Sequence, residues 1–204
     1  MTDLEFSAFL VSRVCHDLVG PLGAVVNGLE VLEDERDAAM RADALKIVTS
    51  SAAQALARLQ FMRLAFGAAG SAGAELPLGE VGTLIAGLMS VGRVTLEFDP
   101  PPVHWPKDWA KLLMNATLIG VDCLPRGGVV RIEANGFGQA PGFKVTATGT
   151  GARISEDVER ALKGEICEHD ARGVQPVLTF RLAKGVNAGL TITPREGAVE
   201  LVAG

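Results

Sequence analysis

Near the start of the chain, a histidine followed by an acidic residue stands in a run of helical spacing. His16 lies two residues after Val14 and two before Leu18, and both apolar residues belong to a stripe that a helix would turn inward. An offset of two residues is roughly 200° around an α-helix, so we expect the His16 imidazole to point into solvent. A neutral, exposed imidazole is a good nucleophile near neutral pH, which favours group transfer through this ring.

The residues that follow the histidine predict how a partner would reach the ring. The Asp17 carboxylate could hold the orientation of the ring or take up its proton. Pro21 lacks an N–H and crowds the carbonyl of Asp17, so we expect the helix to bend one turn past His16, with Gly20 and Gly23 removing bulk beside the bend. Phosphoryl transfer needs mainly in-line positioning and charge neutralisation. We therefore expect Gly20 and Pro21 to shape a docking surface for a partner that supplies Mg²⁺ and an acceptor aspartate.

Other polar residues that could take part in chemistry are predicted to have smaller roles. Arg13 lies one turn before His16 on nearly the same face, and we expect it to pair with the phosphoryl group or with acidic residues of a docked partner. A solvated arginine is the alternative. Cys15 has no cationic surroundings that would lower its pKa, so it is expected to be inert. His104 and His169 fall in predicted loops and are expected to do no chemistry.

Two long antiparallel helices, predicted over residues 4–66, would carry the histidine. Thr2 and Glu5 have the spacing of a capping box, and an acidic break at 33–37 separates the helices. A lone hairpin would leave its apolar stripes partly in water, whereas two hairpins meeting as a four-helix bundle would bury them. Residues 1–67 are therefore predicted to form a homodimer, and packing of the hairpin on its own chain is the alternative. The stripes are Val11, Val14, Leu18, Leu22, Val25, Leu29 and Leu32, and then Leu45, Val48, Ala52, Ala55, Leu59, Met62 and Phe66.

The rest of the chain changes its periodicity. Residues 68–77 are small and nearly chargeless, which predicts an interdomain linker. Residues 78–204 mix helical and strand periods, which predicts a sheet with helices on one face, an α/β sandwich, and hence an α+β chain overall. Helices are expected at 78–89, 107–123, 155–163 and 175–184, strands at 94–98, 129–133, 143–148, 190–193 and 198–202, and a proline-rich loop at 101–106.

The composition argues against several classes of protein. The net charge is −5 and no basic stripe is present, so we expect no nucleic-acid partner. The three cysteines show no CxxC spacing and the three histidines no ligand spacing, which argues against a disulfide framework or a metal enzyme. Without an uninterrupted apolar run of about 18 residues or a basic leader, we expect no membrane association and a cytoplasmic location.

Several of these motifs together resemble a histidine kinase. The histidine, aspartate and proline of residues 16–21 resemble the H-box, which lies on the first helix of a dimerising hairpin. Residues 112–116, LLMNA, resemble the N-box helix of the kinase ATP-binding domain, and the strand at 128–133 falls where that domain has one. Residues 148–151, TGTG, lie where kinases have a DxGxG loop. The resemblance implies a dimerising hairpin followed by an ATPase-like sandwich.

Departures from the kinase pattern concern the ATP site. The aspartate that would open the glycine loop and accept from the adenine amine is replaced by Ala147, or by Thr148 if the alignment shifts by one. An N-box asparagine one turn before Asn115 is replaced by Lys111. The lid motif Gly-x-Gly is replaced by RGVQP at 172–176. We therefore predict a degenerate ATPase fold without a cofactor, in which Asn115 is a structural remnant.

This combination resembles the ChpT-type histidine phosphotransferases of bacterial cell-cycle relays. The resemblance implies a homodimer in which His16 takes a phosphoryl group from the receiver of a hybrid histidine kinase and gives it to response regulators. Mg²⁺ would be supplied at the receiver, and the second domain would add a docking surface. The alternatives are a dimeric adaptor that binds receivers without chemistry and an ATP-dependent kinase. The matching runs are CHD at 15–17 with Pro21, GLEVLED at 28–34, LQF at 59–61, AFGA at 65–68 and KGE at 163–165.

Overall fold

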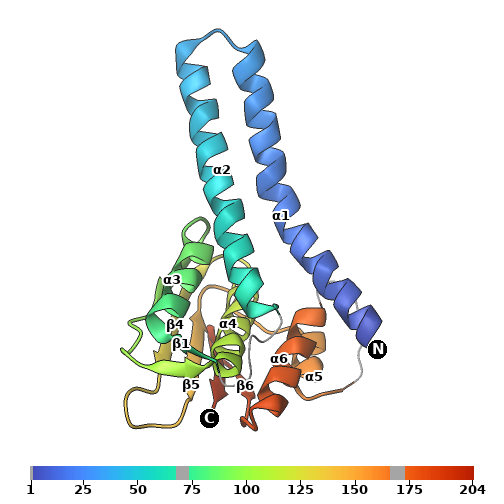
Figure 1. The fold of residues 1–204 in the computed structure, drawn as a ribbon, viewed down its shortest axis with the longest axis vertical. Helices are drawn as coiled ribbons and strands as arrows, with labels where there is room; N and C mark the ends of the chain where they lie inside the picture. The colour runs from blue at the N-terminus through green and yellow to red at the C-terminus, as the bar shows by residue number, and fades with distance from the viewer. Residues whose placement is uncertain (1, 68–73, 166–172) are drawn as a thin grey trace.

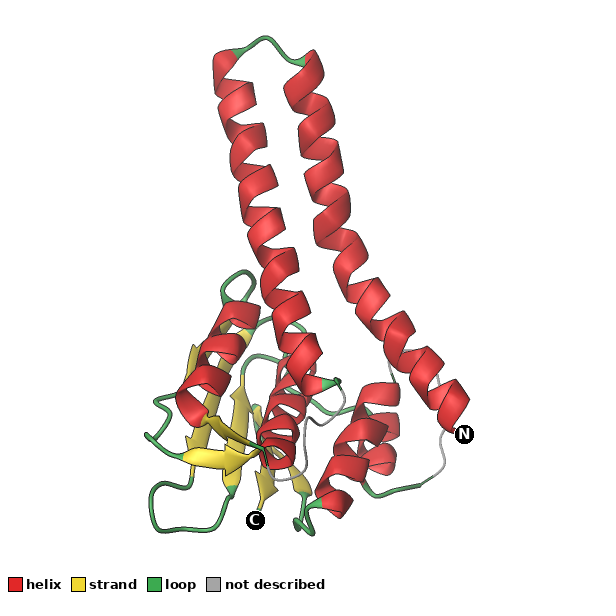
Figure 2. Cartoon of the chain, viewed as in Figure 1, coloured by secondary structure: helices red, strands yellow, loops and turns green. Residues whose placement is uncertain are grey.

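The computed structural model places a long helical hairpin on top of an α/β domain (Figure 1). It describes residues 2–67, 74–165 and 173–204. Every strand lies in the lower domain, and the projecting part is entirely helical (Figure 2). The predicted α+β class, a helical hairpin followed by a sandwich, is confirmed.

The hairpin consists of α1, Asp3–Asp34, and α2, Ala38–Ala65. Thr2 caps α1 through the predicted capping box, because its hydroxyl accepts from the Glu5 N–H while the Glu5 carboxylate accepts from the Thr2 N–H. Asp37 caps α2 by accepting from two backbone N–H groups. The two predicted helices are thus confirmed, and the acidic break at 33–37 spans the last two residues of α1 and the connection to α2.

The two helices approach closely near the hairpin tip and diverge toward the N-terminus (Figure 1). A Cβ at Gly28 would lie 2.6 Å from Val48 Cγ2, so only glycine permits this approach without a shift. Pro21 is buried inside the helix, and α1 changes direction along its length as a proline there would require. Pro21 is thus buried, and its expected part in shaping a docking surface through the bend stays a prediction.

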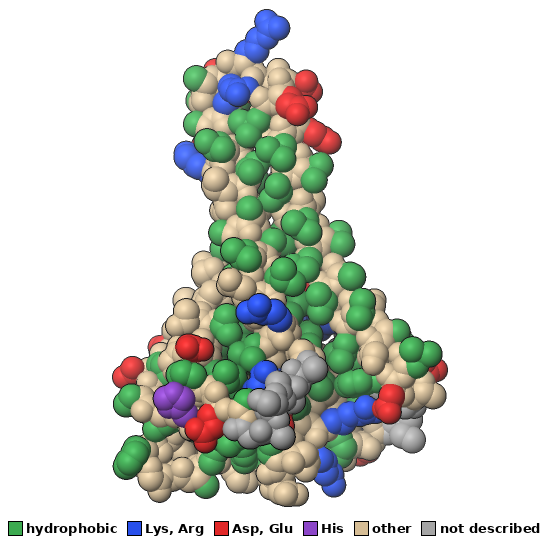
Figure 3. Space-filling view, viewed as in Figure 1, with side chains coloured by type: hydrophobic (Ala, Val, Ile, Leu, Met, Phe, Trp, Pro, Cys, Tyr) green, Lys and Arg blue, Asp and Glu red, His purple; other side chains and the backbone are tan. Residues whose placement is uncertain are grey.

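Much of the apolar surface of the hairpin stays exposed in the single chain. The predicted stripe residues Val11, Leu22 and Leu29 are exposed. Hydrophobic side chains cover both helices along the length of the hairpin (Figure 3). The larger exposed members on the two helices are Leu4, Val11, Val19, Leu22, Val26, Leu29, Val31, Met40, Leu45, Ile47, Leu56 and Leu59.

The C-terminal domain contains a five-stranded sheet in the order β2-β4-β5-β7-β6. Its first pair, β2 with β4, is parallel, and the other pairs are antiparallel. The elements are α3 (Leu78–Met89), β2 (Val94–Glu97), α4 (Lys107–Asp122), β4 (Gly128–Ala134), β5 (Phe143–Thr148), α5 (Glu156–Leu162), α6 (Val174–Gly185), β6 (Thr191–Arg195) and β7 (Ala198–Ala203). These bounds agree with the predicted elements within a few residues.

The helices cover one face of this sheet, as predicted. Alternate residues of the central strands, such as Val130, Val145 and Leu201, are buried beneath α4. At Gly120 of α4, a Cβ would lie 3.2 Å from Val145 Cγ1, which shows how closely this helix rests on the sheet. The opposite face carries surface ion pairs, among them Lys144 with Glu200 at 3.2 Å.

Part of the predicted linker and of the predicted proline-rich loop is ordered as a second, small sheet. Strand β1, Glu75–Pro77, pairs antiparallel with β3, His104–Pro106. The linker prediction for 68–73 lies outside the described residues, and its last residues belong to the C-terminal domain instead. His104 is therefore a strand residue and not a loop residue, which corrects that prediction. Strands of three residues are too short to show an alternating pattern in the sequence.

Helix α1 is the one described helix that is long and apolar enough to cross a membrane by length and composition. The sequence criterion asked for an uninterrupted apolar run, which α1 does not contain; α1 passes here because its average hydropathy is high and it has few charged residues. The same composition suits a hairpin helix whose exposed face packs on a second hairpin.

Candidate functional site

The His16 side chain projects from the middle of α1 and is 65% exposed, as its offset from the apolar stripe predicts. Its Nδ1 lies 3.2 Å from Asp17 Oδ1, at hydrogen-bond distance. When Nδ1 carries the proton and donates a hydrogen bond to the Asp17 carboxylate, Nε2 is left with a free lone pair. The geometry thus gives the ring one bound nitrogen and one nucleophilic nitrogen.

Asp17 is held by two arginines from different helices. Its Oδ2 accepts from Arg13 Nε at 2.9 Å, one helical turn earlier. Its carbonyl, which Pro21 leaves without the usual helical donor, accepts instead from Arg58 Nη1 of α2 at 3.3 Å. The carboxylate and the backbone beside His16 are therefore both fixed by contacts.

Arg13 itself is turned inward and not toward a partner. Its side chain is 12% exposed, and its Nη2 lies 3.7 Å from Asp122 Oδ2 at the end of α4. Burial acts to lower the pKa of the Arg13 guanidinium, but the pairs with Asp17 and Asp122 outweigh it and raise that pKa. The alternative of a solvated arginine is therefore wrong, whereas a contact of Arg13 with a docked partner or with the phosphoryl group stays a prediction. Through Asp122, Arg13 joins α1 of the hairpin to α4 of the C-terminal domain.

Gly20 lies on the exposed surface beside the histidine. A Cβ at this position would meet nothing within 4 Å, and the same holds for Gly23. Open space next to His16 agrees with close approach by a globular partner. The docking role of Gly20 stays a prediction.

The N-box residues form structural contacts between α4 and the end of α2. Asn115 is fully buried, and its Nδ2 donates to Ala65 O at 3.0 Å and to Lys111 O at 2.9 Å. Lys111 Nζ donates to Gly67 O at 2.7 Å. Both side chains thereby satisfy carbonyls at the C-terminus of α2, which has no further helical donors.

Helix α6 also contacts Asn115 of α4. Gln175 is buried, and its Nε2 donates to Asn115 O at 2.8 Å and to Asn115 Oδ1 at 3.2 Å. Thr179 Oγ1 lies 3.3 Å from the same nitrogen. The amide oxygen of Asn115, which could otherwise coordinate a metal ion, is thus occupied by a protein donor.

The glycine loop is also packed against protein. Ala147 is fully buried within β5 and offers no acceptor for an adenine amine. A Cβ at Gly149 would lie 2.5 Å from Gly127 O, so this part of the loop contacts the turn before β4. Gly173 caps α6, whereas Arg172 lies outside the described residues. The predicted loss of the ATP site stays a prediction.

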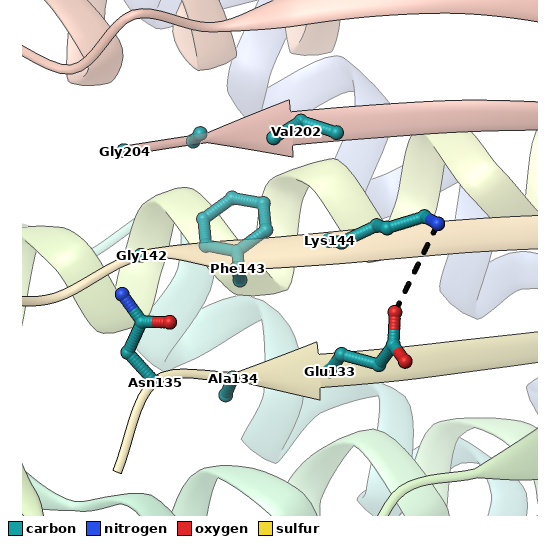
Figure 4. A pocket seen from close by; sticks show the side chains of 9 residues that line it. Glu133, Ala134, Asn135, Gly142, Phe143, Lys144, Val202 and Gly204 are labelled. Atoms are coloured by element: carbon teal, nitrogen blue, oxygen red, sulfur yellow. Dashed lines mark ion pairs between the residues drawn. The ribbon is translucent and has the colours of Figure 1, made fainter. Parts of the chain in front are cut away.

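The other cysteines and histidines differ in exposure where the structure describes them. Cys15 is exposed and free, whereas burial raises the pKa of the Cys123 thiol to about 12; Cys167 and His169 lie outside the described residues. Among the described residues, no group of three or more His, Cys, Asp or Glu side chains could hold a metal ion. A shallow pocket at the ends of β4, β5 and β7 contains a Lys144–Glu133 pair but none of the predicted site residues (Figure 4).

Sequence reasoning missed Arg58 and Asp122. A signal for Arg58 existed, because Pro21 leaves the Asp17 carbonyl without a helical donor and Arg58 is a basic residue among the apolar residues of α2. Asp122 gave no such signal, since nothing local indicates that the end of α4 lies beside Arg13.

Comparisons with known proteins agree on one family. The model of the histidine phosphotransferase C-terminal domain matches residues 78–198. The protein phosphotransferase ChpT of Brucella abortus (strain 2308) is 36% identical over 204 residues, which covers 99% of this chain and 95% of that protein. A 1.7 Å structure of a bacterial phosphotransferase superposes with a TM-score of 0.89 at 33% identity, over 100% of this chain and 98% of the other. The chain therefore belongs to the ChpT-type histidine phosphotransferases.

Proposed function

We propose that this histidine phosphotransferase carries the phosphoryl group on His16 Nε2. It receives the group from the receiver aspartate of a hybrid histidine kinase and passes it to response-regulator receivers. The observation that carries this proposal is the pairing of an exposed imidazole with Asp17, which engages Nδ1 and leaves Nε2 facing solvent.

The transfer itself is a displacement at phosphorus. The Nε2 lone pair attacks the aspartyl phosphate of the docked receiver, the N–P bond forms, and the P–O bond to the receiver carboxylate breaks. As the N–P bond forms, positive charge develops on the ring, and the Asp17 carboxylate, 3.2 Å from Nδ1, stabilises that charge. The reverse sequence delivers the group to the next receiver. Mg²⁺ held by the receiver would neutralise charge on the phosphoryl oxygens in both directions.

We further propose that the chain does not use ATP. In support, the Asn115 and Lys111 side chains donate hydrogen bonds to carbonyls at the end of α2, and the Gln175 amide donates to the Asn115 amide oxygen. A nucleotide with its Mg²⁺ would have to break these buried contacts before it could bind.

The active form is proposed to be a cytoplasmic homodimer in which two hairpins form a four-helix bundle. The exposed apolar side chains along both helices support it, because a contiguous apolar surface of this length is unfavourable in water. Light scattering should give about twice the 21.3 kDa chain mass. Leu56→Lys should shift the protein toward monomer, whereas Val202→Lys on the open sheet face should not. A monomeric wild type would contradict the dimer.

The phosphotransfer proposal is tested with a labelled, phosphorylated receiver and the purified protein. A parallel reaction contains ATP alone, and His16→Ala is the control variant. We expect acid-labile label on the wild type only with the receiver, and none on His16→Ala. Label from ATP alone would mean an active kinase. No label from any member of a panel of candidate receivers would favour the non-catalytic adaptor.

A further inference from the structure

We propose that Arg13 and Asp122 are positioning residues, through which the C-terminal domain sets the tautomer of the His16 ring. This inference rests on the proposed phosphoryl transfer through His16. It assigns the second domain a part in preparing the phosphate acceptor, in addition to any contact that this domain makes with a receiver.

A continuous series of polar contacts joins α4 to the imidazole. Asp122 Oδ2, at the last residue of α4, lies 3.7 Å from Arg13 Nη2. Arg13 Nε donates to Asp17 Oδ2 at 2.9 Å. The other carboxylate oxygen, Asp17 Oδ1, lies 3.2 Å from His16 Nδ1. Each side chain in the series thus fixes the next one.

The two carboxylate oxygens of Asp17 contact two different side chains, and these two contacts determine the orientation of the carboxylate. Arg13 holds Oδ2, so the plane of the carboxylate cannot turn freely and Oδ1 stays directed at Nδ1. Which nitrogen of a neutral imidazole carries the proton depends on the hydrogen bond that the ring makes. Without Arg13, the carboxylate could rotate into solvent, and the ring would distribute its proton over both nitrogens.

Asp122 lies on a helix that is itself firmly attached to the hairpin. Asn115 and Lys111 of the same helix bind the C-terminal carbonyls of α2. Near its N-terminus, α1 also contacts α6, where the Arg181 guanidinium lies 4.2 Å from the centre of the Phe6 ring. The position of Asp122 relative to Arg13 is thus set by contacts that lie outside the series itself. Asn115 and Lys111, which lie at the N-box position, therefore help to fix Asp122 beside Arg13 and through it the orientation of His16.

The test measures the tautomer of His16 directly. Long-range ¹H–¹⁵N NMR of the unphosphorylated, full-length protein separates the two nitrogens of each of the three histidines. The variants are Arg13→Gln, Arg13→Lys and Asp122→Asn. Arg131→Gln, which removes an ion pair with Glu97 on the open sheet face, is the matched control, and His104 is the internal reference.

We expect Nδ1–H to dominate in the wild type at His16 and to lose population in Arg13→Gln, and to a smaller degree in Asp122→Asn. Arg13→Lys should restore part of it, and Arg131→Gln should leave it unchanged. The rate of transfer from a phosphorylated receiver should fall on the order of tenfold in Arg13→Gln, less than the roughly 100-fold that a displacement of about 1 Å can cause.

An unchanged His16 tautomer in folded Arg13→Gln would overturn the proposal. If that variant does not fold, Asp122→Asn decides, because its side chain is 56% exposed and its replacement creates no cavity. The tautomer is measured on unphosphorylated protein and does not depend on phosphoryl transfer. A wild-type protein that accepts no phosphoryl group would therefore overturn the proposed function but not the proposed control of the His16 tautomer.

Discussion

Replacing Asn115 with alanine removes the side chain that joins α4 to the end of α2. Two hydrogen bonds from Nδ2 are lost, to Ala65 O at 3.0 Å and to Lys111 O at 2.9 Å. Lys111 O keeps its helical partner, whereas Ala65 O lies in the last turn of α2 and loses a buried donor. An unsatisfied buried acceptor costs about 1–3 kcal/mol and the second bond about 1 kcal/mol, so we expect a loss of about 2–4 kcal/mol in the free energy of unfolding.

Urea denaturation measures this loss by two signals. Trp105 and Trp109 report the C-terminal domain by fluorescence, and far-ultraviolet circular dichroism reports all helices. Asn135→Ala is the control, because Asn135 makes a similar bond to Ala140 O in an exposed loop. A loss below about 0.5 kcal/mol for Asn115→Ala would refute the structural role of this residue.

Asn115→Asp separates the structural role from metal binding. A carboxylate would face the carbonyl oxygens that the amide now binds, so this variant should be less stable than Asn115→Ala. If Asn115 instead bound Mg²⁺ with a nucleotide, Asn115→Asp would keep a metal ligand, and Mg²⁺ with ATP would raise its unfolding midpoint.

Two further predictions concern packing and pH. Gly28→Ala should be less stable than Gly23→Ala by about 1–3 kcal/mol in urea denaturation. The reason is that a Cβ at Gly28 would lie 2.6 Å from Val48 Cγ2, whereas a Cβ at Gly23 would meet open space. Equal stabilities of the two variants would contradict the close approach of α1 and α2. Burial raises the pKa of Cys123 from 9.0 to about 12, so the folded state holds its proton longer than the unfolded state. Its contribution to stability is fully present below pH 9 and is lost as the pH rises through 12, and Cys123→Ala should show a weaker fall in stability over this interval.

The features that could be predicted best from the sequence are those that depend on local periodicity. The offset of His16 from Val14 and Leu18 placed the ring in solvent, because the helical period applies to any uninterrupted helix. The long C-terminal helix and the alternating strands were found for the same reason. The missing aspartate at Ala147 could be recognised as a departure because the residue type alone removes the acceptor.

Contacts between distant segments were beyond this reasoning. Arg13 was expected near a partner, but its pairing with Asp122 depends on how the hairpin rests on α4. Pro21 was expected to bend the helix, but which neighbour its ring would face depends on the rotation of α1 relative to α2. The strand at His104 has only three residues and pairs with a segment that resembled a linker. Tertiary packing decided each of these positions.

The most direct test of the central claim identifies the atom that carries the phosphoryl group. The protein is labelled with ¹⁵N on its histidines, phosphorylated by a charged receiver, and examined by ³¹P–¹⁵N NMR at neutral to alkaline pH. The account predicts a single coupled phosphorus on Nε2 of His16, the ring nitrogen that Asp17 does not contact. Phosphorus coupled to Nδ1 of His16, or to another histidine, would contradict it.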